Sequence, residues 1–274
     1  RSFHVTGVQT CALPISCAVM GFPLMVRAIR LSMEAIDPKL EAAARTLGDV
    51  FVVAPDREQS ATSHSLTLHH PLRPVQLADQ RWQVDGTPTD CVMLAIEALM
   101  PARPDFVLSG VNHGPNMGED VLYSGTVAAA MEGLMLGVPA IAVSFAGRDF
   151  VSNRAAIEAQ VAPLATLLRH LTTLPEFPPH TLLNVNIPPV APADIKGVRL
   201  TRLGRRVFSD SIARMKDPWG RPIYWIGGGS VTWTSGEGTD ADAVRQGYIS
   251  VTPLHLDITH EARLDDAERW WKAP

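Results

Sequence analysis

The sequence predicts an α/β fold with a mostly parallel sheet and helices on both of its faces. From residue 50 onward, short β-branched apolar runs alternate with stretches of helical periodicity. Such alternation favours parallel strands, because parallel neighbours need long crossover connections that are usually helices. Hydrophobic residues form 46% of the 274 residues and charged residues 19%. This composition supplies a substantial core and argues against global disorder.

The first predicted elements are a strand over residues 50–54 and a helix that opens at Thr87. Thr87 is the expected N-cap, Pro88 suits the first helical position, and Asp90 stands three residues after the cap. Asp90 either caps this helix or positions the residues of a site without contacting the ligand itself. The apolar positions of the helix predict a stripe that faces a core. They are Cys91, Leu94, Ala95, Ala98 and Leu99.

The remaining elements continue the alternation. Apolar runs predict strands at 105–109, 139–144, 182–187 and 248–252, and helical periodicity predicts helices at about 124–136 and 154–171. After about residue 200 the segments become short and polar, and they carry Trp219, Trp225 and Trp233. This part predicts a β-hairpin extension whose tryptophans pack or form an oligomer surface. An acidic tail helix is expected after the last strand.

The loop at residues 109–118 is the most informative local motif. It reads Ser-Gly-Val-Asn-His-Gly-Pro-Asn-Met-Gly, and it lies between a predicted strand and a predicted helix that opens at 124–126. Glycine lets the backbone approach a ligand closely, asparagine offers neutral oxygens and N–H donors, and a helix N-terminus favours negative charge. The loop therefore predicts phosphate chemistry.

Composition excludes several other functions. The net charge of −4 gives no basic footprint for a nucleic-acid polymer. Cys11, Cys17 and Cys91 have no metal-ligand spacing, and an odd count suits a reducing cytoplasm. No apolar run reaches the roughly 20 residues of a membrane span. A dinucleotide-binding dehydrogenase fits the fold class, but no Gly-x-Gly-x-x-Gly follows a first strand.

Six ordered motifs between residues 49 and 260 resemble the SurE family of survival-protein nucleotidases. They are APDREQSATSHSLT (54–67), GTPTDCV (86–92), SGVNHGPNMG (109–118), YSGTVAAAMEG (123–133), NVNIP (184–188) and GTDADAVRQGYISVTPL (238–254). The resemblance implies a Rossmann-like fold and removal of phosphate from nucleoside 5′- and 3′-monophosphates. It also implies a divalent cation, Mg²⁺ or Mn²⁺, and a homodimer or homotetramer built through an extension at about 205–260.

The resemblance also assigns candidate site residues. Ser60 and Asn112 match the family's metal-binding serine and asparagine. The positions that hold the phosphate are matched by Asn116, Ser124, Gly125 and Thr126. Each has a simpler alternative: a serine in a turn, asparagines in left-handed turn conformations, or an ordinary helix cap.

Two adjacent residue pairs that contain histidine are also considered as catalytic or metal-binding groups: Ser63-His64 and His69-His70. The sequence supplies no third member for either pair, so we assign them no role in the site.

One motif of the family is missing. Its members carry a first strand that runs into Asn-Asp-Asp-Gly, whose paired aspartates supply the anionic metal ligands, and this chain contains no such motif. Neutral serine and asparagine oxygens are poor substitutes for two carboxylates around a hard cation. We expect a first strand that is missing or replaced, weak metal binding and impaired turnover. The catalytic residue itself stays unassigned.

The first 48 residues fit a different origin. Residues 5–15 (VTGVQTCALPI) resemble the translation of a sequencing-library adapter, and residues 18–48 resemble the cytoplasmic loop of molybdate-type ABC transporter permeases. We expect an artefactual tail at 1–16, a foreign permease-like segment at 17–48 and a nucleotidase domain at 49–274. The alternatives are a disordered N-terminus, a transporter component, and an inactive remnant that only binds nucleotide or self-associates.

Overall fold

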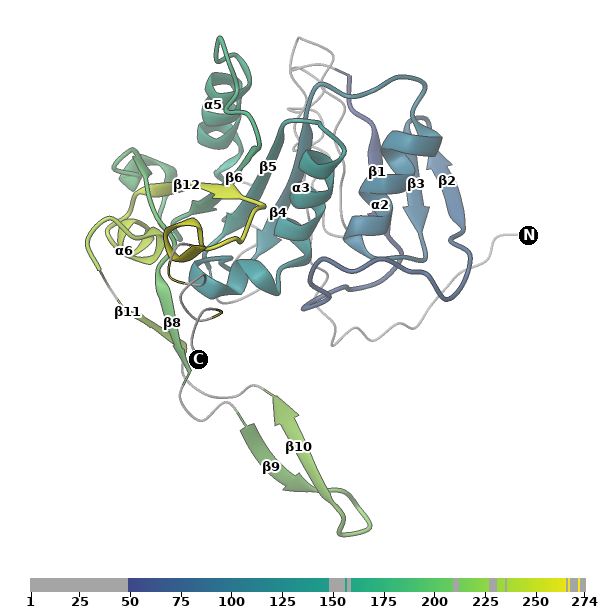
Figure 1. The fold of residues 1–274 in the computed structure, drawn as a ribbon, viewed down its shortest axis with the longest axis vertical. Coiled ribbons are helices and arrows are strands. Elements are labelled where there is room, and N and C mark those ends of the chain that lie inside the picture. Colours follow the sequence, from purple (N-terminus) through teal and green to yellow (C-terminus); the bar gives the residue numbers. More distant parts are fainter. Residues whose placement is uncertain are drawn as a thin grey trace.

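A computed structural model describes residues 49–147, 156, 159–208, 212–226, 231–234, 236–264, 266 and 271. The predicted tail and permease-like segment therefore lie outside the described residues, and so does any replacement for the first strand that was expected to be missing. Figure 1 shows a layered body of strands and helices from which one long hairpin projects.

The main sheet has five strands in the order β4-β5-β6-β12-β7. Their bounds are Val107–His113, Ala140–Phe145, Thr181–Ile187, Ile249–His255 and Val198–Leu200. β4, β5 and β6 are parallel, β12 runs antiparallel to β6, and β7 is parallel to β12. The mostly parallel sheet is therefore confirmed, and the strands expected at 105–109, 139–144, 182–187 and 248–252 are all present.

A smaller sheet has the order β1-β3-β2, with bounds Val52–Pro55, Arg81–Val84 and Pro74–Ala78. β1 and β4 share the same two core clusters: Val52 packs in one cluster with Leu108, and Val53 packs in the other with Val107. The two sheets therefore share both core clusters. Among the described residues, no backbone pairing joins β1 to β4.

Helices cover both faces, as predicted. The cluster that holds Leu108 includes Leu164 and Leu168 of α5 (Val161–Thr172), and the cluster that holds Val107 includes apolar residues of α2 (Pro88–Leu94) and α3 (Gly125–Met135). α5 begins later than the predicted residue 154, and residues 148–155 lie outside the described part. The short helix α6 (Asp240–Arg245) was not predicted.

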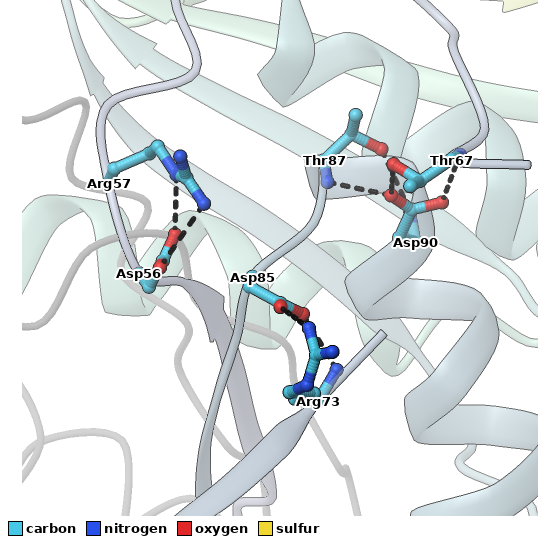
Figure 2. Close-up of polar contacts among 7 residues, drawn as sticks. All are labelled: Asp56, Arg57, Thr67, Arg73, Asp85, Thr87 and Asp90. Atoms are coloured by element: carbon cyan, nitrogen blue, oxygen red, sulfur yellow. Dashed lines mark hydrogen bonds and ion pairs between the residues drawn. The ribbon is translucent and has the colours of Figure 1, made fainter. Parts of the chain in front are cut away.

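The start of α2 confirms the predicted cap. The Thr87 side chain accepts from the backbone N–H of Asp90, and the Asp90 carboxylate accepts from the backbone N–H of Thr87 at 2.8 Å. Asp90 also accepts from the backbone and hydroxyl of Thr67, at 2.9 and 2.6 Å, as Figure 2 shows. Asp90 therefore caps the helix and secures the preceding loop. Figure 2 also shows the ion pairs Arg57–Asp56 and Arg73–Asp85.

The predicted apolar stripe of α2 is correct at Cys91 and Ala95, which are fully buried, but wrong at Ala98, which is exposed. The helix widens into a five-residue π-helical turn, η1 (Ala95–Leu99). A π turn shifts the angular register of the residues after it, so spacing derived from an ideal helix no longer predicts which face they occupy.

The predicted hairpin extension is present as an arm of four strands. β8 (Arg205–Phe208) pairs antiparallel with β11 (Val231–Thr234), and β9 (Ile212–Lys216) pairs antiparallel with β10 (Pro222–Ile226). The β9–β10 hairpin projects away from the body (Figure 1). Trp219 and Trp225 are exposed on the arm, whereas Trp233 packs at its base against a core cluster that includes Met117.

Three short 3₁₀ helices complete the described structure: η2 (Gly118–Leu122), η3 (Pro192–Asp194) and η4 (Glu261–Arg263). The expected acidic tail helix falls partly on residues outside the description. None of the helices within the described ranges has the length and apolar character that crossing a bilayer demands.

Candidate functional site

A pocket of about 200 Å³ lies where the carboxyl end of β4, the loop after β1 and the N-terminus of α3 meet. All six residues that the sequence singled out line this one pocket. The lining residues are Ser60, Ala61, Asn112, His113, Pro115, Asn116, Asp120, Tyr123, Ser124, Gly125, Thr126 and Arg206. Residues from three separate motifs therefore converge on one place, as a binding site requires.

Part of the segment 109–118, which was predicted to be a loop, is a strand. Residues 109–113 belong to β4, and the pairing of β4 with β5 shifts in register between Ser109 and Asn112. Gly110 sits at this irregularity with a φ of 142°, and a Cβ there would lie 2.3 Å from the backbone oxygen of Val143. Glycine is needed here for close packing of two strands, since any side chain would collide with β5.

The turn at Asn116 is held by buried asparagines of β6. The backbone N–H of Asn116 donates to Oδ1 of Asn186 at 2.9 Å, and its carbonyl accepts from Nδ2 of Asn186 at 3.0 Å and Nδ2 of Asn184 at 2.8 Å. The Asn116 side chain donates to the Ser144 hydroxyl at 2.7 Å. The asparagines of the NVNIP motif therefore fix the position of Asn116 in the pocket wall.

The two candidate metal ligands differ in environment. Asn112 is 9% exposed, and its Nδ2 donates to the carbonyl of Gly114 at 2.9 Å. This bond uses the amide nitrogen and leaves the amide oxygen as the atom suited to a cation. Ser60 is exposed, and its hydroxyl donates to Glu58 at 2.6 Å. Both supply neutral oxygens.

Ser124 is the N-cap of α3, and its Oγ accepts from the backbone N–H of Val127 at 3.1 Å. The simpler interpretation of Ser124 as a helix cap is thus correct, and the residue also lines the pocket. A Cβ on Gly125 would lie 2.9 Å from Pro88 and 3.3 Å from the backbone oxygen of Gln59. Gly125 therefore lets the loop that carries Ser60 pack closely on the helix start.

Sequence reasoning missed two charged residues of the pocket wall. Asp120 and Arg206 form an ion pair there, and their side chains are 13% and 20% exposed. Burial lowers the pKa of Arg206, but a guanidinium remains protonated at neutral pH. The two residues stand in separate segments of the sequence, and no local pattern relates them.

Asp240 connects the pocket to the base of the arm. Its carboxylate accepts from the backbone N–H groups of Gly118 at 2.9 Å, Gly204 at 2.7 Å and Ala241 at 2.7 Å. Asp240 is fully buried, and this burial raises its pKa above the usual range, although the backbone donors act in the opposite direction. The turn before Asp120 and the residue before β8 are thus held by one side chain.

The histidine pairs do not form a catalytic group in the described structure. Nε2 of His64 lies 2.8 Å from Oε2 of the buried Glu132, so the ring has an acidic partner that the sequence did not reveal. The Ser63 hydroxyl donates its proton to the carbonyl of Leu122 at 2.6 Å. His69 and His70 are exposed.

The described residues alone do not fit a divalent cation. Nowhere in the described ranges do three His, Cys, Asp or Glu side chains gather as a metal site. The carboxylate among the described lining residues is Asp120, and it pairs with Arg206. Hard cations in proteins are held mainly by carboxylate oxygens, and Ser60 with Asn112 offers no charge.

Comparison with known proteins identifies relatives over most of the chain. The family model described as Survival protein SurE matches residues 16–210. The 5′-nucleotidase SurE of Gemmatimonas aurantiaca is 70% identical over 235 residues, covering 86% of this chain and 93% of that protein. The 5′-nucleotidase SurE of Geobacter metallireducens is 48% identical over 231 residues, covering 84% of this chain and 90% of that protein.

A solved structure shows the same fold. The crystal structure of the SurE protein from Aquifex aeolicus matches with a TM-score of 0.76 and 38% identity, covering 90% of this chain and 99% of that one. The Rossmann-like architecture expected from the motifs is thereby confirmed. On the family match and these relatives together, the chain belongs to the SurE family of survival proteins.

Proposed function

We propose that the chain is a 5′-nucleotidase: a phosphatase that hydrolyses nucleoside 5′- and 3′-monophosphates. The observation that carries this proposal is the convergence of Ser60, Asn112, Asn116 and residues 124–126 on one pocket. The 5′-nucleotidase names of its relatives support the same reaction. The pocket is polar and small, which suits a phosphate group better than a whole nucleotide.

In this proposal the N-terminus of α3 holds the phosphate. Backbone N–H groups at a helix start point toward an anion, and the helix dipole adds about 0.3–1 kcal/mol at an exposed site. Thr126 is 1% exposed and Ser124 is 8% exposed, so donors at this helix start act in a partly desolvated place. Asn116, which is held in place by Asn186, adds an amide to the lining of the same pocket.

A divalent cation, Mg²⁺ or Mn²⁺, belongs to the proposed reaction, with Ser60 and Asn112 as its ligands. When bound, it would polarise a phosphoryl oxygen and lower the pKa of a bound water. We propose that this chain binds the cation weakly and turns over slowly, because it lacks Asn-Asp-Asp-Gly. An inactive remnant that only binds nucleotide or self-associates is the second candidate, and the same lack of carboxylates favours it.

Phosphate release from nucleoside monophosphates with Mg²⁺ or Mn²⁺ separates these candidates. We expect little release from this chain and a large recovery when an apolar strand ending in Asn-Asp-Asp-Gly is grafted before Asp49. The grafted protein carrying Asn112→Ala is the matched control and should lose the recovered activity. A grafted protein that folds and remains inactive would overturn the enzyme assignment and leave the remnant.

We propose that the arm forms a homodimer or homotetramer. The β9–β10 hairpin exposes Ile223, Tyr224, Trp225 and Ile226, and a projecting apolar hairpin is typical of an interface. Light scattering after gel filtration should show an oligomer that Trp225→Arg converts to smaller species. Leu68→Arg, at a residue 81% exposed and outside the arm, should leave the mass unchanged. A monomeric wild type would refute this proposal.

The domain boundaries and the location are also proposals. The family match reaches residue 16, which weighs against a boundary at residue 48, whereas the adapter-like and permease-like strings weigh for a tail at 1–16, a foreign segment at 17–48 and a nucleotidase domain at 49–274. Adapter bases upstream of the codon for Ile15 and a discontinuity near Gly48 in the gene would support the boundaries, and a continuous gene would refute them. The odd number of cysteines, one of them the buried Cys91, suits a reducing cytoplasm.

A further inference from the structure

Tyr123 places a large aromatic side chain on the wall of the pocket. It lines the pocket together with Ser124 and Gly125, and it is 57% exposed. No other Phe, Tyr or Trp is among the described residues of the pocket wall. A residue that lines a pocket and is more than half exposed lies at the opening of that pocket. An exposed tyrosine is ordinary elsewhere on a protein surface, but here its ring is accessible to any part of a ligand that extends outside.

The pocket has room for only part of the proposed substrate. Its volume is about 200 Å³, whereas pockets that enclose a drug-sized ligand measure about 300–1,000 Å³. A nucleoside monophosphate is a ligand of that size, and its phosphate is the part that the N-terminus of α3 attracts. The nucleoside therefore has to lie outside the pocket, at its opening.

Tyr123 is adjacent in the sequence to the groups that would hold the phosphate. It directly precedes Ser124, the N-cap of α3, and Ser124, Gly125 and Thr126 line the same pocket. The N–H groups without partners inside a helix belong to its first turn. Because consecutive Cα atoms are about 3.8 Å apart, a ring one residue before the N-cap lies within reach of the group bonded to a phosphate at the helix start.

The backbone of Tyr123 is held in place before a ligand arrives. Its N–H donates to the carbonyl of Asp120 at 3.1 Å, and its own carbonyl accepts from the N–H of Ser63 at 3.3 Å. The hydroxyl of Ser63 donates to the carbonyl of the preceding residue, Leu122, at 2.6 Å. A side chain on a positioned backbone loses less entropy when it contacts a ligand.

We propose that the Tyr123 ring stacks on the base of the bound nucleoside monophosphate, while the pocket takes the phosphate. This inference rests on the proposed function, because it takes the pocket to be the phosphate site. Every nucleobase has a flat π-face, so the ring favours nucleotides over other phosphate monoesters without selecting one base. Tyrosine suits this place, since its ring is apolar and its hydroxyl remains in water.

The test measures binding and not turnover, so slow catalysis does not obscure it. Equilibrium dialysis of the full chain in metal-free buffer uses radiolabelled orthophosphate, ribose 5-phosphate and adenosine monophosphate, of which only the last carries a base. The variants are Tyr123→Phe, Tyr123→Leu and Tyr123→Ala. The matched control is Leu122→Ala, at the adjacent residue, which is also 57% exposed and does not line the pocket.

Wild type should bind adenosine monophosphate more tightly than ribose 5-phosphate. We expect Tyr123→Ala to bind adenosine monophosphate about tenfold to a hundredfold more weakly, the range for loss of one stacked base. Tyr123→Phe keeps the ring and should match wild type, and Tyr123→Leu should fall between Tyr123→Phe and Tyr123→Ala. Orthophosphate and ribose 5-phosphate should stay within about twofold of wild type in all variants, as should every ligand in Leu122→Ala.

The arms of the experiment separate stacking from a structural role. If Tyr123 only shaped the helix start, its loss would weaken all three phosphate ligands equally, and that result would refute the inference. Wild-type binding of adenosine monophosphate by Tyr123→Ala, or by Tyr123→Leu should Tyr123→Ala be unstable, refutes stacking while the proposed function stands. If wild type and the grafted protein bind no phosphate ligand at all, the proposed function fails, and the inference fails with it.

Discussion

Two buried asparagines on β6 hydrogen-bond to Asn116 in the pocket wall, and replacing each in turn shows which hydrogen bond stabilises that wall more. Asn184 and Asn186 are both fully buried and lie two residues apart, so they occupy the same face of the strand. Replacing either with alanine removes the same atoms and leaves a similar space. The two substitutions differ in what they do to the hydrogen bonds of Asn116.

Asn186→Ala leaves the backbone N–H of Asn116 without its acceptor, since this N–H donates to Oδ1 of Asn186. A buried donor without a partner costs about 1–3 kcal/mol. Asn184→Ala removes one donor to the Asn116 carbonyl, which still accepts from Asn186. It also removes Oδ1 of Asn184, a buried oxygen that has no hydrogen-bond partner among the described residues. The second substitution should therefore cost about 1–3 kcal/mol less.

Urea unfolding followed by circular dichroism measures the difference, and thermal unfolding should show it as a gap of about 2–4 °C per kcal/mol. Orthophosphate affinity should fall in Asn186→Ala and change little in Asn184→Ala, because only the first loosens the turn that presents Asn116. The reasoning is refuted if Asn184→Ala destabilises the protein as much as Asn186→Ala or more.

Three further substitutions test other parts of the structure. Burial raises the pKa of the Asp240 carboxyl, so its contribution to the free energy of unfolding is fully present below the unfolded pKa of about 3.9 and declines as pH rises through the folded pKa. Urea unfolding from pH 4 to 7 should show that decline in wild type and not in Asp240→Asn. Equal pH profiles for the two proteins would contradict this reasoning. Gly110→Ala should lower the free energy of unfolding by about 3 kcal/mol or more, because the new Cβ meets β5, and a loss below 1 kcal/mol in urea would count against this packing. Thr87→Ala should cost about 1 kcal/mol through loss of the α2 cap; an unchanged melting temperature would show that the cap is dispensable.

The features that the sequence predicts well are those whose signals are local. The cap formed by Thr87 and Asp90 is read from four adjacent residues and is present as expected. Ser124 is likewise a cap. Local hydrogen bonds determine such features, so a short stretch of sequence carries the whole argument.

The features that the sequence does not predict depend on tertiary contacts. Ala98 is exposed because α2 widens into a π turn, and β4 continues to His113 because its glycine allows close packing on β5. The pairing of Asp120 with Arg206 joins residues 86 positions apart. Neither partner belongs to a motif with a recognisable spacing, so only the path of β8 beside the pocket reveals the pair.

The charges of the described structure bear directly on the proposed cation. Each of its buried acidic side chains already has a partner in the protein. The Asp90 carboxylate accepts from Thr67 and Thr87, and the Asp240 carboxylate accepts from three backbone N–H groups. The Asp242 carboxylate accepts from Arg245 and Gln246, and Glu132 contacts His64.

On the pocket wall, Asp120 is neutralised by Arg206. A cation at Ser60 and Asn112 would meet the carboxylate of Glu58, which is exposed and accepts from the Ser60 hydroxyl. One exposed carboxylate is a poor substitute for two adjacent aspartates, so the cation has little reason to leave its water shell. Calorimetric titration with Mn²⁺ should accordingly show weak binding to this chain and tighter binding after the Asn-Asp-Asp-Gly graft. Equal, tight binding by both would show that Ser60 and Asn112 do not need the paired aspartates.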